Sequence, residues 1–290
     1  MTAPSPVTAK IRQILTGKLL GLLEEWAKAE PEKYDRFFAA FGSLFKTGVN
    51  SDYGHRERIQ ALLRFESTKT EAGGRTSLQD YVGRMKDGQE AIYYLLGSHR
   101  DTAIRNPNLE YFRKHDLEVL LLTDPVDAFV VPGLDAFEGK PLKSIEKADL
   151  DLKPDEDVQQ DALAADATGR LIERFKTTLG DRVEDVVASK RLVDSAATLV
   201  VGKEGLDAQM ERMMKLMNED FKGARKVLEV NPAHPLLKNL ARLQEAGVTD
   251  GEAFLAWTKT SRPWVGPPPR DVMERYDKHI EGIAKAFGLD

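Results

Sequence analysis

Apolar residues recur every three or four positions through the first 66 residues, which is the spacing of one face of an amphipathic helix. Pro31 separates the first stripe from the second, and the turn-forming segment 50–54 precedes a third. The three stripes are Ile11, Ile14, Leu15, Leu19, Leu22, Leu23 and Trp26; Phe37, Phe38, Phe41, Leu44 and Phe45; and Ile59, Leu62, Leu63 and Phe65. We expect three helices, at about 8–66, that bury these faces against one another.

From about residue 73 to 150 the pattern changes to helices alternating with short apolar runs. Ser77, with Asp80 three positions later, resembles a capping box at a helix start. The apolar runs 91–96 and 118–122 are typical of buried strands, and a helix starting at Asn106 lies between them. This order predicts a small, largely parallel sheet covered by helices.

An acidic stretch at about 149–167 indicates a domain boundary. We expect a first domain at 1–150, with its alpha-beta-alpha unit at 73–150, and a second at 151–290. In the second, a helix should precede strands near 183–188 and 197–201, and further helices should follow. The predicted fold class is α+β, with mixed helix and sheet.

Four of the seven methionines fall between residues 210 and 217. At helical spacing they form one apolar face, which consists of Leu206, Met210, Met213, Met214 and Met217. Thioether side chains are flexible and can repack against partners of different shapes, so such a face suits a promiscuous binder. The alternative is that these methionines fill a core.

The amino-acid composition of the chain limits the kinds of partner that it can bind. The chain has 42 basic and 47 acidic residues, a formal charge of -5, which disfavours wide contact with a nucleic-acid backbone. It has no cysteine, which excludes disulfides and thiolate chemistry and fits a reducing compartment, so a cytoplasmic location is expected. The sequence shows neither an export signal nor an apolar run of about 18 residues, so no membrane partner is expected.

Motifs for catalysis are weak. Gly133 and Gly139-Lys140 have five intervening residues where a phosphate loop has four. The five histidines show no metal-ligand spacing. We therefore expect no catalytic residue, no cofactor-binding residue and no metal site in this chain.

Several blocks, in register along the chain from about residue 7 to 245, resemble one family. They include residues 33–42, 77–94, 191–195, 209–213 and 229–235. The resemblance is to the 90-kilodalton heat-shock chaperone family, and in particular to its bacterial-type members.

The resemblance implies a domain arrangement. Family members begin with an ATP-binding domain and a middle-domain loop that supplies a catalytic arginine, and this chain matches the family after that loop. We therefore expect ATP and Mg²⁺ to bind in a preceding domain, and no ATP hydrolysis by this chain itself. The chain is expected to be a fragment comprising the later middle domain, a helical coil plus an alpha-beta-alpha unit, and the C-terminal dimerisation domain.

The resemblance also implies binding sites. The methionine segment matches the family's client-contacting helix, so its apolar face should meet nonnative polypeptide. A second client-contacting position matches Phe129, although Pro132-Gly133 should interrupt the helix that carries it.

The tail beyond residue 250 departs from the family pattern, because a proline-rich segment at 262–269 precedes the last helix. A homodimer is still expected. Its predicted dimerisation residues are Phe254, Trp257, Met273, Tyr276, Ile280, Ile283 and Phe287.

The leading hypothesis is a fragment of a molecular chaperone of the stress response. It would bind unfolded or partly folded clients and form a homodimer, with other chaperones as further partners. One alternative is a dimeric adaptor that binds a single dedicated protein, and another is a hydrolase that uses scattered carboxylates.

Overall fold

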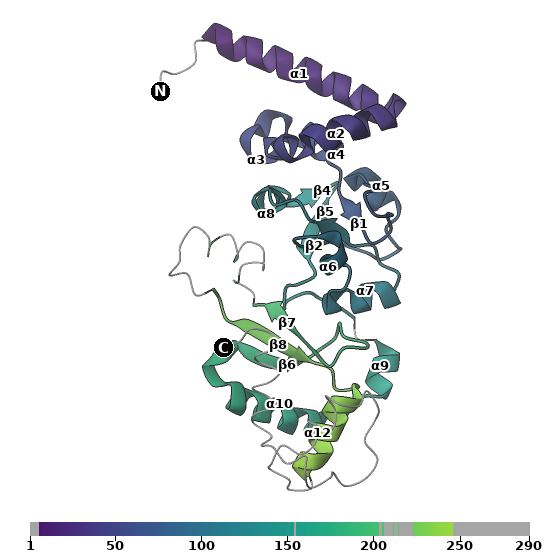
Figure 1. Ribbon diagram of the computed structural model, residues 1–290, viewed down its shortest axis with the longest axis vertical. Helices are drawn as coiled ribbons and strands as arrows, with labels where there is room; N and C mark the ends of the chain where they lie inside the picture. Colours follow the sequence, from purple (N-terminus) through teal and green to yellow (C-terminus); the bar gives the residue numbers. More distant parts are fainter. Residues whose placement is uncertain are drawn as a thin grey trace. The chain divides into compact units, whose positions relative to one another are not determined.

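The computed structural model describes most of the chain up to residue 245. The described residues are 6–153, 155–202, 205, 211, 214 and 223–245. The chain divides into two compact units (Figure 1). The first unit comprises Met1–Ile104 and Leu117–Ser144, and the second comprises Arg105–Asp116 and Ile145–Asp290.

Four helices open the first unit: α1 Pro6–Ala29, α2 Pro31–Lys46, α3 Gly48–Ser51 and α4 Arg56–Leu62. Pro31 sits at the first turn of α2, where its missing N–H costs no helical hydrogen bond. The inner face of α1, with Leu20 and Leu23, is buried with Tyr34 and Phe38 of α2.

The expectation that the helices bury all their apolar faces is wrong for most of α1 and for Phe41 and Leu44 of α2, which are 56% and 73% exposed. Leu23 is buried and Trp26 packs on the core, but the opposite side of the helix is exposed. This exposed stripe on α1 consists of Val7, Ile11, Ile14, Leu15, Leu19 and Leu22. Apolar residues surround so much of α1 that α2 and α4 cannot cover them all.

The sheet of the first unit has the strand order β1-β3-β2-β5-β4. Its strands are β1 Glu66–Ser67, β2 Ile92–Leu96, β3 Leu120–Leu122, β4 Ala136–Phe137 and β5 Lys140–Ser144. β2 runs parallel to both β3 and β5, whereas the edge strands β1 and β4 are antiparallel to their neighbours. The predicted strands at 91–96 and 118–122 are thus confirmed as β2 and β3, and they pair in parallel.

Short helices surround this sheet: α5 Leu78–Gly83, α6 Arg100–Ala103 and α8 Asp127–Val130. Ser77 caps α5 as predicted, because its side chain accepts a hydrogen bond from the backbone N–H of Asp80 at 3.0 Å.

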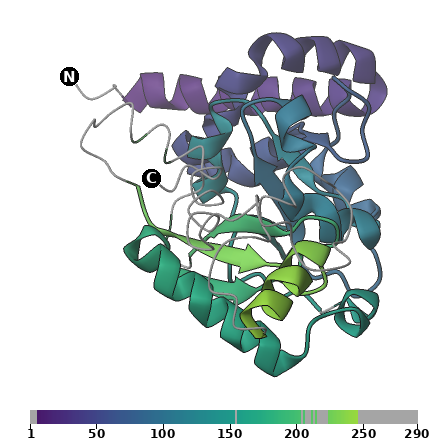
Figure 2. The ribbon, with the colours of Figure 1, turned by 60° about the horizontal axis from the view of Figure 1, so that its bottom comes forward.

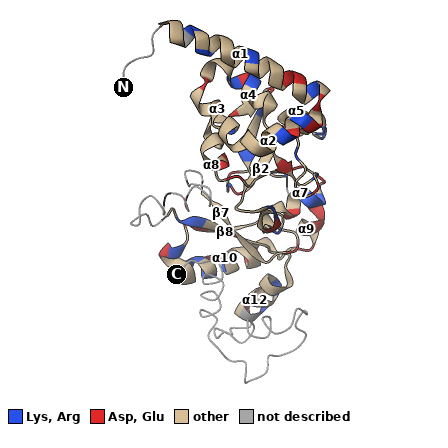
Figure 3. Ribbon diagram, turned by 45° about the horizontal axis from the view of Figure 1, so that its top comes forward, with Lys and Arg blue, Asp and Glu red and all other residues tan. Residues whose placement is uncertain are grey.

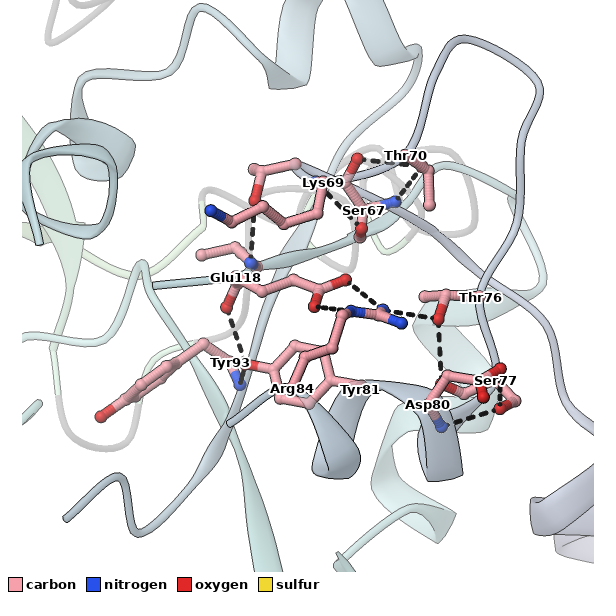
Figure 4. A network of polar contacts seen from close by, with 12 residues as sticks. Ser67, Lys69, Thr70, Thr76, Ser77, Asp80, Tyr81, Arg84, Tyr93 and Glu118 are labelled. Atoms are coloured by element: carbon pink, nitrogen blue, oxygen red, sulfur yellow. Dashed lines mark hydrogen bonds and ion pairs between the residues drawn. The ribbon is translucent and has the colours of Figure 1, made fainter. Parts of the chain in front are cut away.

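A polar network joins α5 to β3 (Figure 4). Arg84 donates from Nε and Nη2 to the two carboxylate oxygens of Glu118, at 2.9 and 2.8 Å. The Tyr81 hydroxyl donates to the Glu118 carbonyl at 2.7 Å and accepts from the Tyr93 N–H at 3.0 Å. Burial raises the pKa of Tyr81, so its hydroxyl stays protonated and can donate.

The second unit contains a three-stranded sheet with the order β6-β8-β7. Its strands are β6 Asp185–Ala188, β7 Ala197–Val201 and β8 Lys226–Val230. β8 pairs in parallel with β6 and antiparallel with β7. The strands predicted near 183–188 and 197–201 are confirmed, whereas β8, the central strand, was not predicted.

Two amphipathic helices, α10 Ala165–Leu179 and α12 Pro235–Glu245, pack on one face of this sheet, which can be followed in Figure 2. Their shared core includes Phe175, Leu228 and Leu237. The remaining described elements of the unit are η2 Pro107–Leu109, α7 Glu110–Lys114, α9 Glu156–Gln160 and η4 Gly180–Arg182.

The Glu110 carboxylate fixes the segment 105–116 within the second unit. One of its oxygens accepts from three successive backbone N–H groups, those of Val193, Asp194 and Ser195, at 2.7, 2.9 and 3.1 Å. The other accepts from the Ser195 hydroxyl. Charge-assisted hydrogen bonds of this kind are among the stronger ones in proteins.

Basic and acidic residues are interspersed along the helices of the first unit (Figure 3). The longest described helix, α1, has 24 residues and carries several charges. Within the described ranges, no helix combines the length and hydropathy of a membrane-spanning segment.

Candidate functional site

Phe129 lies on α8 with 49% of its surface exposed. Its neighbours Ala128 and Val130 are buried, so one short helix holds both a core anchor and an outward-facing aromatic ring. The helix ends at Val130, and the 3-10 turn η3 Val131–Gly133 follows. The expectation that Pro132-Gly133 interrupts the helix is therefore confirmed.

A buried ion pair anchors α8 to α2. Lys46 Nζ lies 2.7 Å from the Asp127 carboxylate, and the two side chains are only 6% and 1% exposed. Asp127 also accepts from the Asp124 N–H at 3.1 Å. Burial raises the pKa of Asp127, while the neighbouring Lys46 charge opposes this rise. The Lys46 charge thus helps the carboxylate remain ionised although it is buried.

Side-chain hydrogen bonds also fix the backbone around Phe129. Asn50 Nδ2 donates to the Phe129 carbonyl at 2.6 Å, and Arg56 donates to the Gly133 carbonyl. A side chain at Gly133 would overlap Asn50, so only glycine fits this close approach. Hence the exposed Phe129 ring extends from a backbone that several hydrogen bonds fix in place.

The methionine segment is described at two positions, Glu211 and Met214, both helical. Glu211 is buried, lies 3.2 Å from Lys226 Nζ and accepts from the Ala224 N–H at 3.2 Å. Met214 is partly buried. The other predicted contact residues of the segment lie outside the described residues: Leu206, Met210, Met213 and Met217.

The predicted dimerisation residues also lie outside the described residues. They are Phe254, Trp257, Met273, Tyr276, Ile280, Ile283 and Phe287.

A hollow of about 610 Å³ in the second unit lies between the two flanks of the methionine segment. Gly205, which precedes the segment, and Ala224, which follows it, both line this hollow. Val187 and Val227 of the sheet contribute apolar surface, and Asp149, Glu184, Asp185 and Arg225 contribute charge. Such a mixed lining can accept a stretch of polypeptide with both apolar and polar side chains.

The exposed stripe on α1 is an apolar surface that sequence reasoning missed. Apart from Val7, its residues were assigned to the buried face of the helix, together with Leu23 and Trp26. The signal that could have found it is the breadth of the apolar surface, because Leu20 and Leu23 already provide the buried side.

Among the residues that the structure describes, no cluster of three or more histidines or carboxylates has the geometry to hold a metal ion.

Comparison with known proteins identifies the family to which this sequence is similar. A family profile described as Hsp90 protein matches residues 5–257. A relative named Chaperone protein HtpG, from Chlorobaculum tepidum, is 52% identical over 247 residues, which are 84% of this chain and 39% of the relative. Proteins of the same name from Geobacter metallireducens and Shewanella amazonensis are 43% and 40% identical, over 81% and 87% of this chain and 37% and 40% of each relative.

The chain thus spans less than half the length of the curated relatives it matches. The profile nevertheless covers both structural units up to residue 257. On these matches, the chain belongs to the Hsp90 family.

Proposed function

We propose that this chain is the part of a molecular chaperone that holds nonnative polypeptides through exposed apolar side chains. The observation that carries the proposal is the half-exposed Phe129 ring on the anchored helix α8. Leaving a large apolar side chain wet forgoes on the order of 1.5–3 kcal/mol relative to full burial. A wet aromatic ring on a firmly held backbone is well suited to contact with unfolded protein.

The proposal includes the position of the chain in a longer protein. Residues 1–150 correspond to the later part of a middle domain, and 151–290 to a C-terminal domain that forms the homodimer. ATP and Mg²⁺ then act in another domain of the full-length protein. This chain binds clients by apolar contact and changes no covalent bond. The setting is the cytoplasm under stress, with other chaperones as further partners.

The methionine face is proposed as the second client contact. Met214 is partly buried, and Gly205 and Ala224, the described residues before and after the segment, line a hollow of mixed polar and apolar character, which supports this proposal. Flexible methionines in such a place could adapt to clients of different shapes. Replacement of Met210, Met213 and Met214 by serine should then weaken the suppression of client aggregation.

The Phe129 contact is tested with a matched pair of variants, Phe129→Ser and Tyr53→Ser. Tyr53 lies in the 3-10 turn η1 Tyr53–His55 of the same unit and is 76% exposed, so it controls for the loss of any exposed aromatic residue. The assay is light scattering of a heat-unfolded reporter enzyme with the chain in excess. Phe129→Ser should lose about half or more of the suppression, whereas Tyr53→Ser should keep it. Equal losses in both variants would contradict the assignment.

The homodimer is tested by sedimentation velocity over a concentration series. We expect the sedimentation coefficient to rise toward that of a dimer as concentration increases. A monomer at all concentrations up to about 100 µM would contradict dimerisation by this chain alone.

The exposed stripe on α1 favours a second candidate function, a dimeric adaptor for one dedicated protein. Leucine and isoleucine surfaces suit one complementary partner better than many, in contrast to methionine surfaces. The two functions differ in breadth of binding. Similar affinity for several unrelated unfolded proteins supports the chaperone, and measurable affinity for only one folded protein supports the adaptor.

A further inference from the structure

A polar cavity of about 170 Å³ lies in the first unit. α2 forms one wall with Gly42, Ser43 and Lys46, and residues 64–66 form another. Gly42 packs closely against the Phe38 ring, and a Cβ atom at this position would clash with that ring unless the ring moved.

The three carboxylates that line the cavity all have partners within the protein. Asp127 is paired with Lys46, and Glu66 lies 2.8 Å from Arg100. Asp124 accepts from the Ser43 hydroxyl and, at 3.1 Å, from the Val126 N–H. These acids are therefore already neutralised or hydrogen-bonded and have little demand for an external cation.

The two arginines that line the same cavity have no carboxylate partner among the residues that the structure describes. Arg64 donates to the carbonyl of Leu63 at 2.9 Å, and its guanidinium lies over the Tyr34 ring at 4.7 Å. Arg75 is exposed and makes no side-chain hydrogen bond or ion pair with any described residue. Both arginines line the same cavity, so an anion bound there would interact favourably with two positive charges that no described carboxylate offsets.

We propose that this cavity binds a phosphate group through Arg64 and Arg75. The guanidinium fork matches the oxygen spacing of phosphate and can donate two hydrogen bonds to it. Thr123, which also lines the cavity, adds a hydroxyl donor. One water occupies about 30 Å³ in the liquid, so the cavity has room for one tetrahedral oxyanion and a few waters. The proposal is independent of client binding.

The phosphate can be the free ion or the end group of a phosphate monoester. Both share the chemistry that the arginines recognise, and a titration distinguishes them. The full chain is titrated in a calorimeter with inorganic phosphate in one arm and with O-phosphoserine in the other, at constant ionic strength maintained with chloride. We expect a dissociation constant on the order of 1 mM or tighter in at least one arm. The titrant with the smaller dissociation constant shows whether the site prefers the free phosphate ion or a phosphate monoester.

Arg75→Gln is the decisive variant, because Arg75 is exposed and its side chain makes no hydrogen bond or ion pair with a described residue that the substitution would break. It should weaken phosphate binding about tenfold. Arg12→Gln is the matched control: Arg12 lies exposed on α1, also makes no side-chain contact with a described residue, and carries the same charge. Arg64→Lys, which keeps the charge and removes the fork, should also weaken binding.

The outcomes are distinct. Loss of affinity in Arg75→Gln and Arg64→Lys, with Arg12→Gln unchanged, supports the site. Equal weakening by Arg12→Gln would show diffuse attraction by surface charge and overturn it. Failure to detect any heat with either titrant up to about 10 mM would overturn it as well.

Discussion

Each unit contains an arginine–glutamate pair beside its sheet, but solvent reaches only one of them. In the first unit Arg84 and Glu118 are 2.8 Å apart, and the arginine side chain is 43% exposed. In the second unit Arg191 and Glu229 are 2.9 Å apart, and the arginine side chain is 2% exposed. The chemistry of the two pairs is the same. The two arginines differ in how much hydration they lose on folding, and this loss determines how much stability is lost when the pair is broken.

The protein replaces the missing water around Arg191. Its guanidinium donates to the Glu229 carboxylate, to the Ile145 carbonyl and, at 2.8 Å, to the Lys147 carbonyl. Arg84 has the Thr76 hydroxyl as a further acceptor and otherwise keeps contact with water. The hydrogen bond with Glu118 raises the pKa of Arg84. We infer that the sealed pair holds the second unit together, whereas the open pair adds modestly to the first.

The largest effect is expected for Glu229→Gln. The substitution keeps the shape of the side chain but leaves the Arg191 charge buried without a counter-charge, which costs about 3–5 kcal/mol. Amide hydrogen exchange of β8 reads this loss in the second unit, and exchange in β3 serves as an internal control in the first. Unchanged protection of β8 would contradict the role given to the sealed pair.

Glu110→Ala should have the next largest effect, also within the second unit. The substitution leaves the N–H groups of residues 193–195 without their shared acceptor. Water can reach part of this segment, so we expect a loss of about 2 kcal/mol. Hydrogen exchange of these amides should accelerate first. Asp101→Ala, at an exposed acidic residue of the first unit, is a control that should change nothing.

Glu118→Gln, the same substitution as in the sealed pair, should have a smaller effect in the first unit. The Arg84 charge can turn toward water when its partner is neutral, so we expect a loss of about 1 kcal/mol. Exchange in β3 measures it, with β8 as the control. A loss as large as that of Glu229→Gln would show that exposure of the arginine does not set the cost.

Elements with a local sequence signal could be predicted, whereas contacts between residues far apart in the sequence could not. Local signals were sufficient for β2 and β3, which are continuous apolar runs, and for the Ser77 cap. The strand β8 was missed because a charged residue, Glu229, occupies a buried position in it. Its partner Arg191 is 38 positions away, and no local pattern indicates such a pairing.

The candidate site shows the same limit. The exposure of Phe129 and the break at Pro132 follow from short stretches of sequence and a family resemblance. The Lys46–Asp127 anchor joins residues 81 positions apart, and the cavity beside it brings Arg64 and Arg75 together with α2. Apolar periodicity also cannot tell which side of α1 remains uncovered, because that depends on the sizes and positions of the neighbouring helices.

The smallest expected effect on stability comes from the side chains that cap one helix in each unit. In the first unit the Ser77 hydroxyl caps α5. In the second, His234 Nδ1 accepts from the Leu236 N–H at 3.1 Å at the start of α12, which requires an unprotonated nitrogen. Burial lowers the pKa of His234 from its usual 6.5, while the charges of Glu110 and Asp194 oppose this shift.

Protonation should therefore loosen α12 but not α5. Below pH 6.5 the unfolded chain binds a proton at His234 more readily than the folded chain does, so this contribution to stability is complete above 6.5 and is lost as the pH falls toward the folded pKa. The loss should be about 1 kcal/mol, one hydrogen bond. It is measured as faster exchange in α12 relative to α5 between about pH 7.5 and 5.5, after correction for the intrinsic pH dependence. His234→Asn keeps a capping oxygen without a titrating group and should abolish the difference. An unchanged pH dependence in that variant would assign the effect to another residue.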